Sequence, residues 1–429
     1  CKILIYSILL YIKITFLRFK LRQLGLALII TGAALGMYLN FFLGDYGWNS
    51  YIMFASIVLL PNYNNLLNFR LPSYCIDLGG ILYFQILCIF YLYSSVLPDE
   101  LSKTQLYTFH LFTIGCIISL MSLKTSDLNF SLIVGYSWIL TSVCTILCFI
   151  CYVSGIYSIE YAKVHSGQGY MSILSELTMT AACTTNIICG LFLNPSKKTL
   201  AILRNILFIL SIISLFLLEK RTPIIISALI IAAYIWRISN ISLRIKVKYL
   251  NYTFIIIIGL LLLLSNPDVI NHVATIFDNI INGISDMLNG TSKSGASATM
   301  RYESREWAFD YIENFNFFEF LFGAGYMTRW LDIPILQSFL DMGIIGFIIY
   351  AWFTFIYPIL IFLSKKSTNK FVLFACFLNF YTVFSAFNSG HPYSHVKWWP
   401  VILLIIIVMH QKKYNDNRLK NSKISLLQS

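Results

Sequence analysis

Long apolar runs constrain this chain more than any other feature of its sequence. They recur along nearly all of the 429 residues, are about 15 to 25 residues long, and are separated by short polar stretches. Because a helix needs roughly 20 apolar residues to cross about 30 Å of hydrocarbon, these runs predict membrane-spanning helices. Only 12% of the residues are charged, against roughly 25% in soluble domains. The sequence therefore predicts an all-α polytopic membrane protein without a separate soluble domain.

We expect about twelve transmembrane helices after residue 23. The predicted spans are 24–43, 48–61, 74–97, 105–123, 130–154, 172–194, 199–218, 223–236, 250–266, 333–363, 371–388 and 398–411. The segment 3–17 contains Lys13 and is barely long enough to cross, so we favour an interfacial or non-cleaved segment over a further span or a signal-like region. The expected divisions are 1–23 (N-terminal segment), 24–266 (spans one to nine), 267–332 (large loop), 333–411 (spans ten to twelve) and 412–429 (basic tail).

Lysine and arginine gather on one side of the predicted membrane. The basic stretches are 18–22, 194–198, 237–248, 364–370 and 411–420. The positive-inside rule makes this side cytoplasmic, which puts the C-terminus in the cytoplasm and the large loop outside. The loop has nine acidic and four basic residues, a formal charge of −5, in a chain of net charge +12. Topology accounts for the basic balance, so nucleic acid is not expected as a partner.

The large outer loop has a pattern that favours folding. Residues 269–288 have helical periodicity, 289–299 ("NGTSKSGASAT") are typical of a hinge, and 300–315 predict a second helix that ends before Gly323 and Gly325. Loops of this length are often functional. We therefore expect this loop to carry part of a site.

Three arginines on the predicted outer face are candidates for binding a multi-oxygen anion. Arg301 and Arg305 are four residues apart, so both project from one face of their helix. Ion pairs with neighbouring acids, such as Glu306, are the alternative. Arg221 lies in a tight outer turn before Pro223, against the positive-inside bias, and its alternative role is to bind lipid headgroups.

The order of these features resembles one family. A tight "KRTP" turn (220–223) precedes the large loop with its arginine-bearing helix, and "LFGAGY" (321–326), "LQSFLDMGIIGF" (336–347), two further spans and a basic tail follow. In this order the chain, over about 195–410, resembles the O-antigen polymerases (Wzy) and, more distantly, the O-antigen ligases (WaaL) of bacterial surface polysaccharide assembly.

The resemblance implies a fold and an activity. The fold would be a GT-C-like membrane glycosyltransferase of the bacterial inner membrane, with the large loop in the periplasm. The enzyme would use neither metal nor cofactor. It would transfer a growing glycan from undecaprenyl pyrophosphate onto another lipid-linked oligosaccharide repeat unit. Its partners would be that lipid-linked oligosaccharide, the lipid bilayer and a chain-length regulator membrane protein.

The resemblance also implies residue roles. Arg221 and Arg301 match the family's outer-face arginines and would stabilise the departing pyrophosphate, with Arg305 and Arg329 as further anion ligands. Gly343 and Gly346 match the small residues that let the next span pack closely. The ligases have a histidine eleven residues before the first of these glycines, whereas this chain has Asp332 there, which favours a polymerase.

Acidic and histidine side chains near the outer face complete the candidate set. Asp332 is a candidate base for the acceptor hydroxyl, with a helix N-cap as the alternative. Asp341 lies deeper in the same predicted helix and is a substrate-binding candidate, or else bonds a neighbouring helix. The last outer turn, "NSGHPYSHVKWW" (388–399), offers His391, His395 and Tyr393 as contacts to glycan. We expect Trp398 and Trp399, in the same turn, at the membrane interface.

Other functions remain open at this point. The ligase is the nearest alternative within the resemblance. A lipid-linked oligosaccharide flippase (Wzx-like transporter) would have similar composition, but it would not need a large folded outer loop. A non-catalytic scaffold would tolerate loss of Arg221 or Arg301. A pump driven by ATP is disfavoured because the sequence has no Walker-type nucleotide loop, and no metal-ligand spacing is present.

Overall fold

The computed structural model describes most of the chain. The described residues are 2–44, 46–67, 75–95, 102–124, 127–157, 174–218, 221–238, 278, 282, 285, 296–387 and 390–428. Among these, side chains are left undescribed at 2–19, 75–76, 221, 238, 296–301 and 412–428. The predicted span 250–266 and the predicted helix 269–288 lie wholly or almost wholly outside the described residues.

Every regular element in the described ranges is helical. In chain order they are α1 (Lys2–Leu43), α2 (Trp48–Leu59), α3 (Tyr63–Leu67), α4 (Cys75–Ser94), α5 (Lys103–Met121), α6 (Phe130–Val153), α8 (Glu176–Phe192), α9 (Lys198–Leu217), α10 (Arg221–Ile238), α13 (Ala296–Glu313), α14 (Phe317–Phe322), α15 (Pro334–Ala351), η2 (Trp352–Ile356), α16 (Tyr357–Leu363), η3 (Lys365–Thr368), α17 (Lys370–Ser385) and α18 (His395–Gln428). Each predicted span other than 250–266 coincides with a helix.

Several of these helices are suited to a membrane. Six helical segments of the described chain are long and apolar enough to cross one: Lys20–Leu43, Asp77–Ser94, Lys103–Met121, Phe130–Val153, Lys198–Leu217 and Pro334–Leu363. Shorter apolar helices are Trp48–Leu59, Thr222–Arg237, Lys370–Ser385 and His395–Gln411. The chain is thus an α-helical membrane protein, as predicted.

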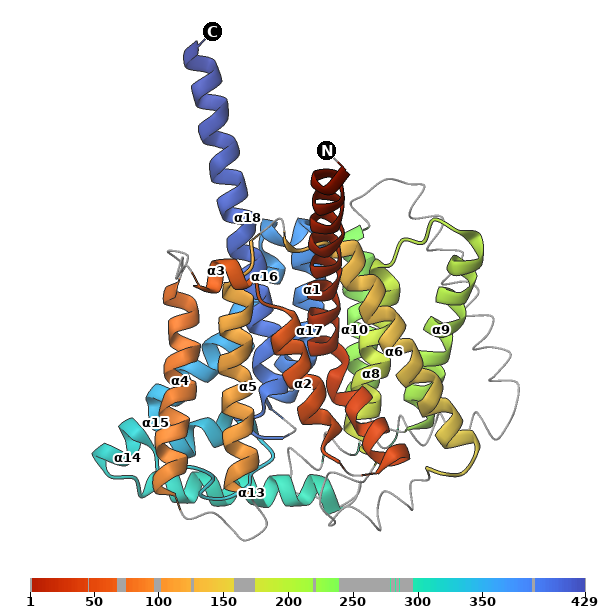
Figure 1. Ribbon diagram of the computed structural model, residues 1–429. Helices are drawn as coiled ribbons and strands as arrows, with labels where there is room; N and C mark the ends of the chain where they lie inside the picture. Colours follow the sequence, from red (N-terminus) through yellow and green to blue (C-terminus); the bar gives the residue numbers. More distant parts are fainter. Residues whose placement is uncertain are drawn as a thin grey trace.

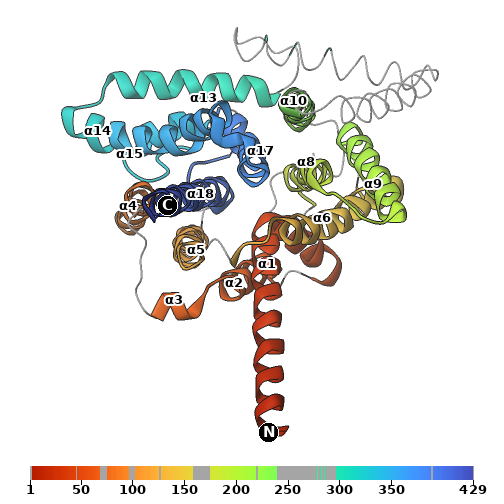
Figure 2. The ribbon, with the colours of Figure 1, turned by 90° about the horizontal axis from the view of Figure 1, so that it is seen from above.

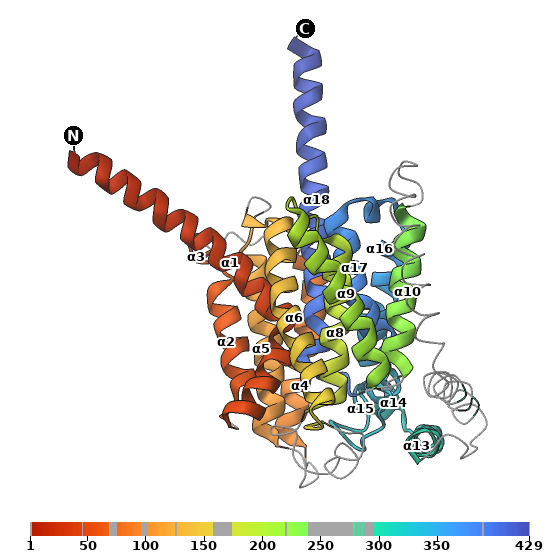
Figure 3. The same ribbon diagram turned by 90° about the vertical axis from the view of Figure 1, so that its right-hand side faces the viewer.

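The two ends of the bundle differ. At one end, α13 and α14 lie across the helix ends, and α13 runs nearly perpendicular to the bundle (Figures 1 and 3). Viewed from above, α13 lies along the edge of the bundle beside α14 and α15 (Figure 2). The C-terminal half of α18 extends away from the opposite end (Figure 1). We call the end with α13 the loop end and the other the tail end.

A polar network closes the tail end. Asp127 accepts hydrogen bonds from Arg22 Nη1 at 2.8 Å, Asn62 Nδ2 at 2.9 Å and the Lys124 amide at 2.9 Å. Gln23 Nε2 donates to the Asp127 carbonyl. Arg237, near the end of α10, donates to the carbonyl oxygens of Phe362 and Ser364, so the last turn of α10 lies beside the end of α16. These contacts join α1, α2 and α10 to the turns that precede α6 and α17.

The N-terminal segment is continuous with the first span. α1 has 42 residues, and at about 1.5 Å per residue such a helix exceeds the roughly 30 Å of a hydrocarbon core. Its first half projects from the bundle at the tail end (Figure 3). The described backbone therefore joins residues 2–19 to the span without a break, and whether they lie on the membrane stays a prediction.

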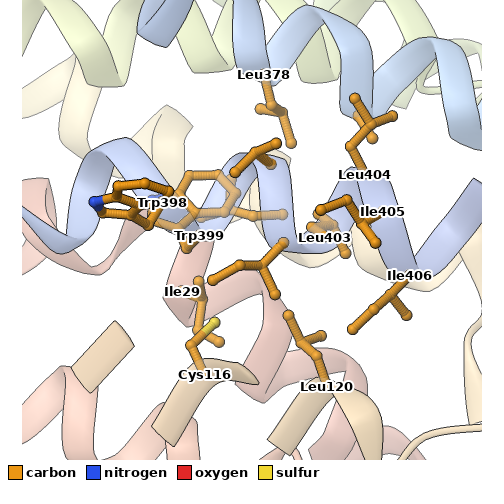
Figure 4. Packing of buried hydrophobic residues seen from close by; sticks show 14 of the residues in the cluster. Ile29, Cys116, Leu120, Leu378, Trp398, Trp399, Leu403, Leu404, Ile405 and Ile406 are labelled. Atoms are coloured by element: carbon orange, nitrogen blue, oxygen red, sulfur yellow. The ribbon is translucent and has the colours of Figure 1, made fainter. Parts of the chain in front are cut away.

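The core surrounds α18. Trp398 and Trp399 are buried among the helices and so do not face lipid, while their position at the membrane interface stays a prediction. Trp398 packs against Phe84 with ring centroids 4.9 Å apart, and its indole nitrogen donates to the Pro392 carbonyl at 2.8 Å. Figure 4 shows both tryptophans beside Leu403, Leu404, Ile405 and Ile406 of α18, with Ile29, Cys116, Leu120 and Leu378 around them. α18 is therefore the central helix of this cluster, which explains why its apolar run has no lipid-facing belt there.

Candidate functional site

Asp341 organises the loop end. Its side chain is 0% exposed and accepts four hydrogen bonds. Oδ2 accepts from the Met327 amide at 3.0 Å, from Gln337 Nε2 at 2.7 Å and from the Tyr393 hydroxyl at 2.7 Å, while Oδ1 accepts from the Thr328 amide at 3.2 Å. This agrees with the expectation that a carboxylate at this depth must be partnered. The carboxylate joins α15, the 323–332 turn and the turn that precedes α18. It has no exposed surface for a substrate to contact.

Two glycines let the chain backbone approach itself closely. α15 is broken at Gly343, where φ is 65° and ψ is −164°. A Cβ on Gly343 would lie 2.4 Å from the carbonyl carbon of Leu321, and a Cβ on Gly323 would lie 2.2 Å from that of Asp341. At this crossing the Ala324 amide donates to Leu340 O at 2.8 Å and the Gly325 amide to Asp341 O at 3.3 Å. The turn therefore takes up carbonyl groups that the helix break releases.

Two stacked tyrosines lie next to Asp341. The rings of Tyr326 and Tyr393 have centroids 4.1 Å apart. His110 of α5 links this stack to α4, because its Nε2 is 2.8 Å from the Tyr326 hydroxyl and its Nδ1 is 2.7 Å from Gln85 Oε1. Burial raises the pKa of the Tyr326 hydroxyl and of the Tyr393 hydroxyl well above the ordinary value. Both phenols thus stay protonated at neutral pH.

Asp332 joins the 323–332 turn to the turn that precedes α18. Its Oδ1 accepts from Trp330 Nε1 at 3.1 Å and from the Gly390 amide at 3.0 Å. Asp332 has a left-handed φ of 56°. The N-cap residue of α15 is Ile333, so the alternative role of Asp332 as the helix N-cap is wrong. Unlike Asp341, the Asp332 side chain is only partly buried. We call Asp332, Trp330 and His391, which are linked by contacts through Trp330, the rim.

The two predicted histidines differ in their surroundings, and only His391 belongs to the rim. The His391 ring packs against Trp330 with centroids 5.1 Å apart, and its Nδ1 accepts from the Tyr393 amide at 3.3 Å. Burial, followed by the nearby positive charge of Lys397, lowers the pKa of His391 to about 3. His391 is therefore neutral and supplies no charge to an anion. His395 lies deeper, against Phe109 and Phe112.

α13 carries the arginines of the loop end. Arg305 lies over the Tyr302 ring at 4.9 Å and 4.0 Å from Glu306 Oε1. Trp307 stacks on Tyr311 with centroids 5.1 Å apart, and the Arg329 guanidinium from the following turn lies 4.6 Å over Trp307. Cation–π contacts of this kind hold a guanidinium in place over an aromatic ring.

Arg221 is the first residue of α10. Arg301 lies in the first turns of α13. The side chains of both residues are not among those described. Arg237 fixes the last turn of α10 at the tail end, so α10 begins at the loop end. The three ribbon views agree that α13 begins beneath α10 (Figures 1, 2 and 3). The backbone thus places the starts of the two helices that carry the predicted catalytic arginines at the same end of the bundle.

A pocket of about 460 Å³ opens at the loop end between the end of α4 and the turn after α14, on the side of the bundle away from α10 (Figure 2). It is lined by Tyr91, Ser94 and Ser95 from the end of α4 and by Gly323–Tyr326 and Thr328 from the turn after α14. Sequence reasoning did not find the α4 residues, because hydroxyls at the end of an apolar run have no distinctive spacing. Tyr326 and His110 were also missed, although a lone histidine in a predicted span is itself a signal of a polar contact.

The predicted site residues therefore form separate groups. Asp332, His391 and Trp330 share the rim, Tyr393 and Asp341 lie beneath it, and Arg305 and Arg329 lie along α13. Among the side chains that the structure describes, no cluster of three or more His, Cys, Asp or Glu could hold a metal ion. Comparison with protein-family models, curated proteins and solved structures gives no match.

Proposed function

We propose that this chain is a polysaccharide polymerase of the bacterial inner membrane, with about twelve spans and the loop end in the periplasm. It would transfer a growing glycan from undecaprenyl pyrophosphate to a sugar hydroxyl of another lipid-linked repeat unit. The main support is the position of α13, which runs along the edge of the bundle at the end opposite the basic tail and begins beneath α10 (Figures 1 and 2). In this proposal, the arginine-bearing helix would meet the pyrophosphate of a membrane lipid at this end of the bundle.

The transfer balances without an outside energy source. The acceptor hydroxyl oxygen attacks the anomeric carbon, the bond from that carbon to the phosphate oxygen breaks, and the new glycosidic bond forms. Undecaprenyl pyrophosphate leaves with the bonding electron pair. Arg221 and Arg301 would stabilise its developing charge, with Arg305 and Arg329 as further ligands. The hydroxyl proton would pass to Asp332, the partly buried carboxylate of the rim.

The proposed orientation predicts which end of the bundle is accessible from outside. Glu306 on α13 and Lys366 in η3 are exposed and lie at opposite ends. Glu306→Cys should react with a membrane-impermeant maleimide in intact spheroplasts, and Lys366→Cys only after the membrane is opened. The eight native cysteines among the described side chains are all buried, so their background labelling should be low. Labelling of Lys366→Cys alone in intact spheroplasts would reverse the orientation and refute the mechanism.

The activity itself is tested by complementation. In a polymerase-null strain that makes the cognate repeat unit, the native chain should restore a ladder of glycan lengths. Arg301→Ala and Arg221→Ala should each lower polymerisation by about 100-fold, the usual cost of removing one group that stabilises transition-state charge. Lys366→Ala removes the same charge from the tail end and should leave the ladder unchanged.

The same strain separates the alternatives. That strain still exports single repeat units, so an added flippase or ligase would leave only single units at the surface and would not produce a ladder. A full ladder from both arginine variants, at equal protein levels, would mean that the arginines do not act on the pyrophosphate.

A further inference from the structure

The pocket between the end of α4 and the 323–328 turn has a chemistry different from that of α13. Its polar side chains are Tyr91, Ser94, Ser95, Tyr326 and Thr328, and none of the residues that line it is charged. A pyrophosphate in such a pocket would lose its water without gaining a cation, which is costly. The pocket therefore does not suit the anionic part of a lipid-linked sugar.

Four of the five hydroxyl groups that line the pocket have already used their hydrogens. Tyr91 donates to Phe322 O at 2.7 Å, Ser94 to Tyr91 O at 3.1 Å, Ser95 to Leu92 O at 3.0 Å and Thr328 to Gly325 O at 2.9 Å. Carbonyl oxygens only accept, so in each pair the hydroxyl is the donor. A hydroxyl has one hydrogen and two lone pairs, so what remains for a ligand is acceptor capacity.

We propose that this pocket binds an uncharged sugar of the acceptor glycan through that sugar's own hydroxyl hydrogens; this deepens, and rests on, the proposed polymerase activity. A sugar supplies several O–H donors and carries no charge, which matches an acceptor-lined, neutral pocket. A volume of about 460 Å³ is within the range of sites for drug-sized small molecules, which is the size class of a sugar. A phosphate, which has only acceptors at its anionic oxygens, is excluded by the same lining.

The pocket is also held rigid from beneath. Tyr326, in its wall, stacks on Tyr393 and bonds His110, and Asp341 accepts from the Thr328 amide. Preorganised acceptors lose little entropy when a ligand binds. The loop end would then have two divisions: arginines on α13 hold the leaving pyrophosphate, and the neutral pocket holds the acceptor.

A pocket-filling substitution tests this division. Ser94 is exposed at the pocket wall, so Ser94→Trp should fold and occupy part of the space. We expect polymer formation in the complementation strain to fall at least about tenfold, the equivalent of losing roughly one well-made contact. The matched control is Tyr93→Trp, because Tyr93 is 81% exposed and is not part of the lining. Equal ladders from the two variants would overturn the acceptor pocket while leaving the polymerase activity established.

Crosslinking gives a second readout that does not need polymerisation. A benzophenone amino acid at position 94, in cells that make the repeat unit, should capture glycan that is detectable by periodate and hydrazide labelling. The same probe at position 93 should capture at least about tenfold less, and cells without the repeat unit should give no labelled adduct. Capture at position 94, together with failure of the native chain to restore a ladder, would refute the polymerase and keep the sugar pocket. No preference for position 94 would refute the pocket.

Discussion

Gly343→Ala is expected to lower the free energy of unfolding by at least about 4 kcal/mol and to stop the protein from accumulating in the membrane. The backbone at Gly343 (φ 65°, ψ −164°) lies in a region that essentially only glycine occupies. In addition, the new methyl group would lie 2.4 Å from the backbone of Leu321, which cannot move as a flexible side chain would. Thermal unfolding of the detergent-purified protein, followed by size-exclusion fluorescence, measures the effect.

Two other glycines serve as controls for this substitution. Gly325 has a φ of 116° but nothing within 4 Å of a new Cβ. Gly325→Ala should therefore lower the free energy of unfolding only through backbone strain, by about 1–3 kcal/mol. Gly135 lies inside α6 with open space around it, so Gly135→Ala should be neutral or slightly stabilising. If Gly343→Ala is as stable as Gly135→Ala, the helix break and its close contact are wrong.

Asp341→Ala is expected to destabilise the protein by about 3–5 kcal/mol, because four hydrogen-bond donors at the loop end lose their acceptor at once. Asp341→Asn provides a graded comparison. Its amide oxygen can replace Oδ2 and keep three donors, so only the Thr328 amide is left facing the NH₂ group. The asparagine variant should therefore lose only about 1–3 kcal/mol.

The same unfolding measurement ranks these variants. Tyr393→Phe removes one donor and leaves the carboxylate with three, so it should rank nearest to the native protein. The expected order of stability is native, Tyr393→Phe, Asp341→Asn, Asp341→Ala. An alanine variant as stable as the asparagine variant would show that Asp341 does not hold the turn and the two helices together.

Sequence reasoning predicted the parts of the fold that depend on composition. Apolar length predicted the helices, and the glycines of "LFGAGY" predicted the turn from loop to membrane. The prediction of one unbroken span at 333–363 missed two features: the break at Gly343 and the π-helical turn at Trp352–Ile356. A run of apolar residues indicates burial in lipid but not helix continuity, because tertiary contacts decide where released carbonyl groups find new donors.

The candidate site was predicted less completely. Asp341 was singled out because a carboxylate in an apolar helix needs partners. Gln337, four residues earlier, has the local spacing of a helical pair, but the other partners lie 13 and 14 residues earlier and 52 residues later, and no local spacing predicts them. The capping box of Asn316 and Glu319 at α14 did have a sequence signal, an Asn followed three residues later by Glu, that we did not use. Contacts across the fold, such as Asp332 with Gly390, require the tertiary structure.

The crossing of the 323–325 turn with α15 also determines an order of assembly. During synthesis, residues 296–332 leave the ribosome before Leu340 and Asp341, the residues whose carbonyl oxygens receive the Ala324 and Gly325 amides. The outer segment consequently has to wait, undocked, until the following span has been inserted and has bent at Gly343. A nascent chain that stalls before residue 341 would expose this segment to proteases, whereas one that stalls after α15 would already protect it.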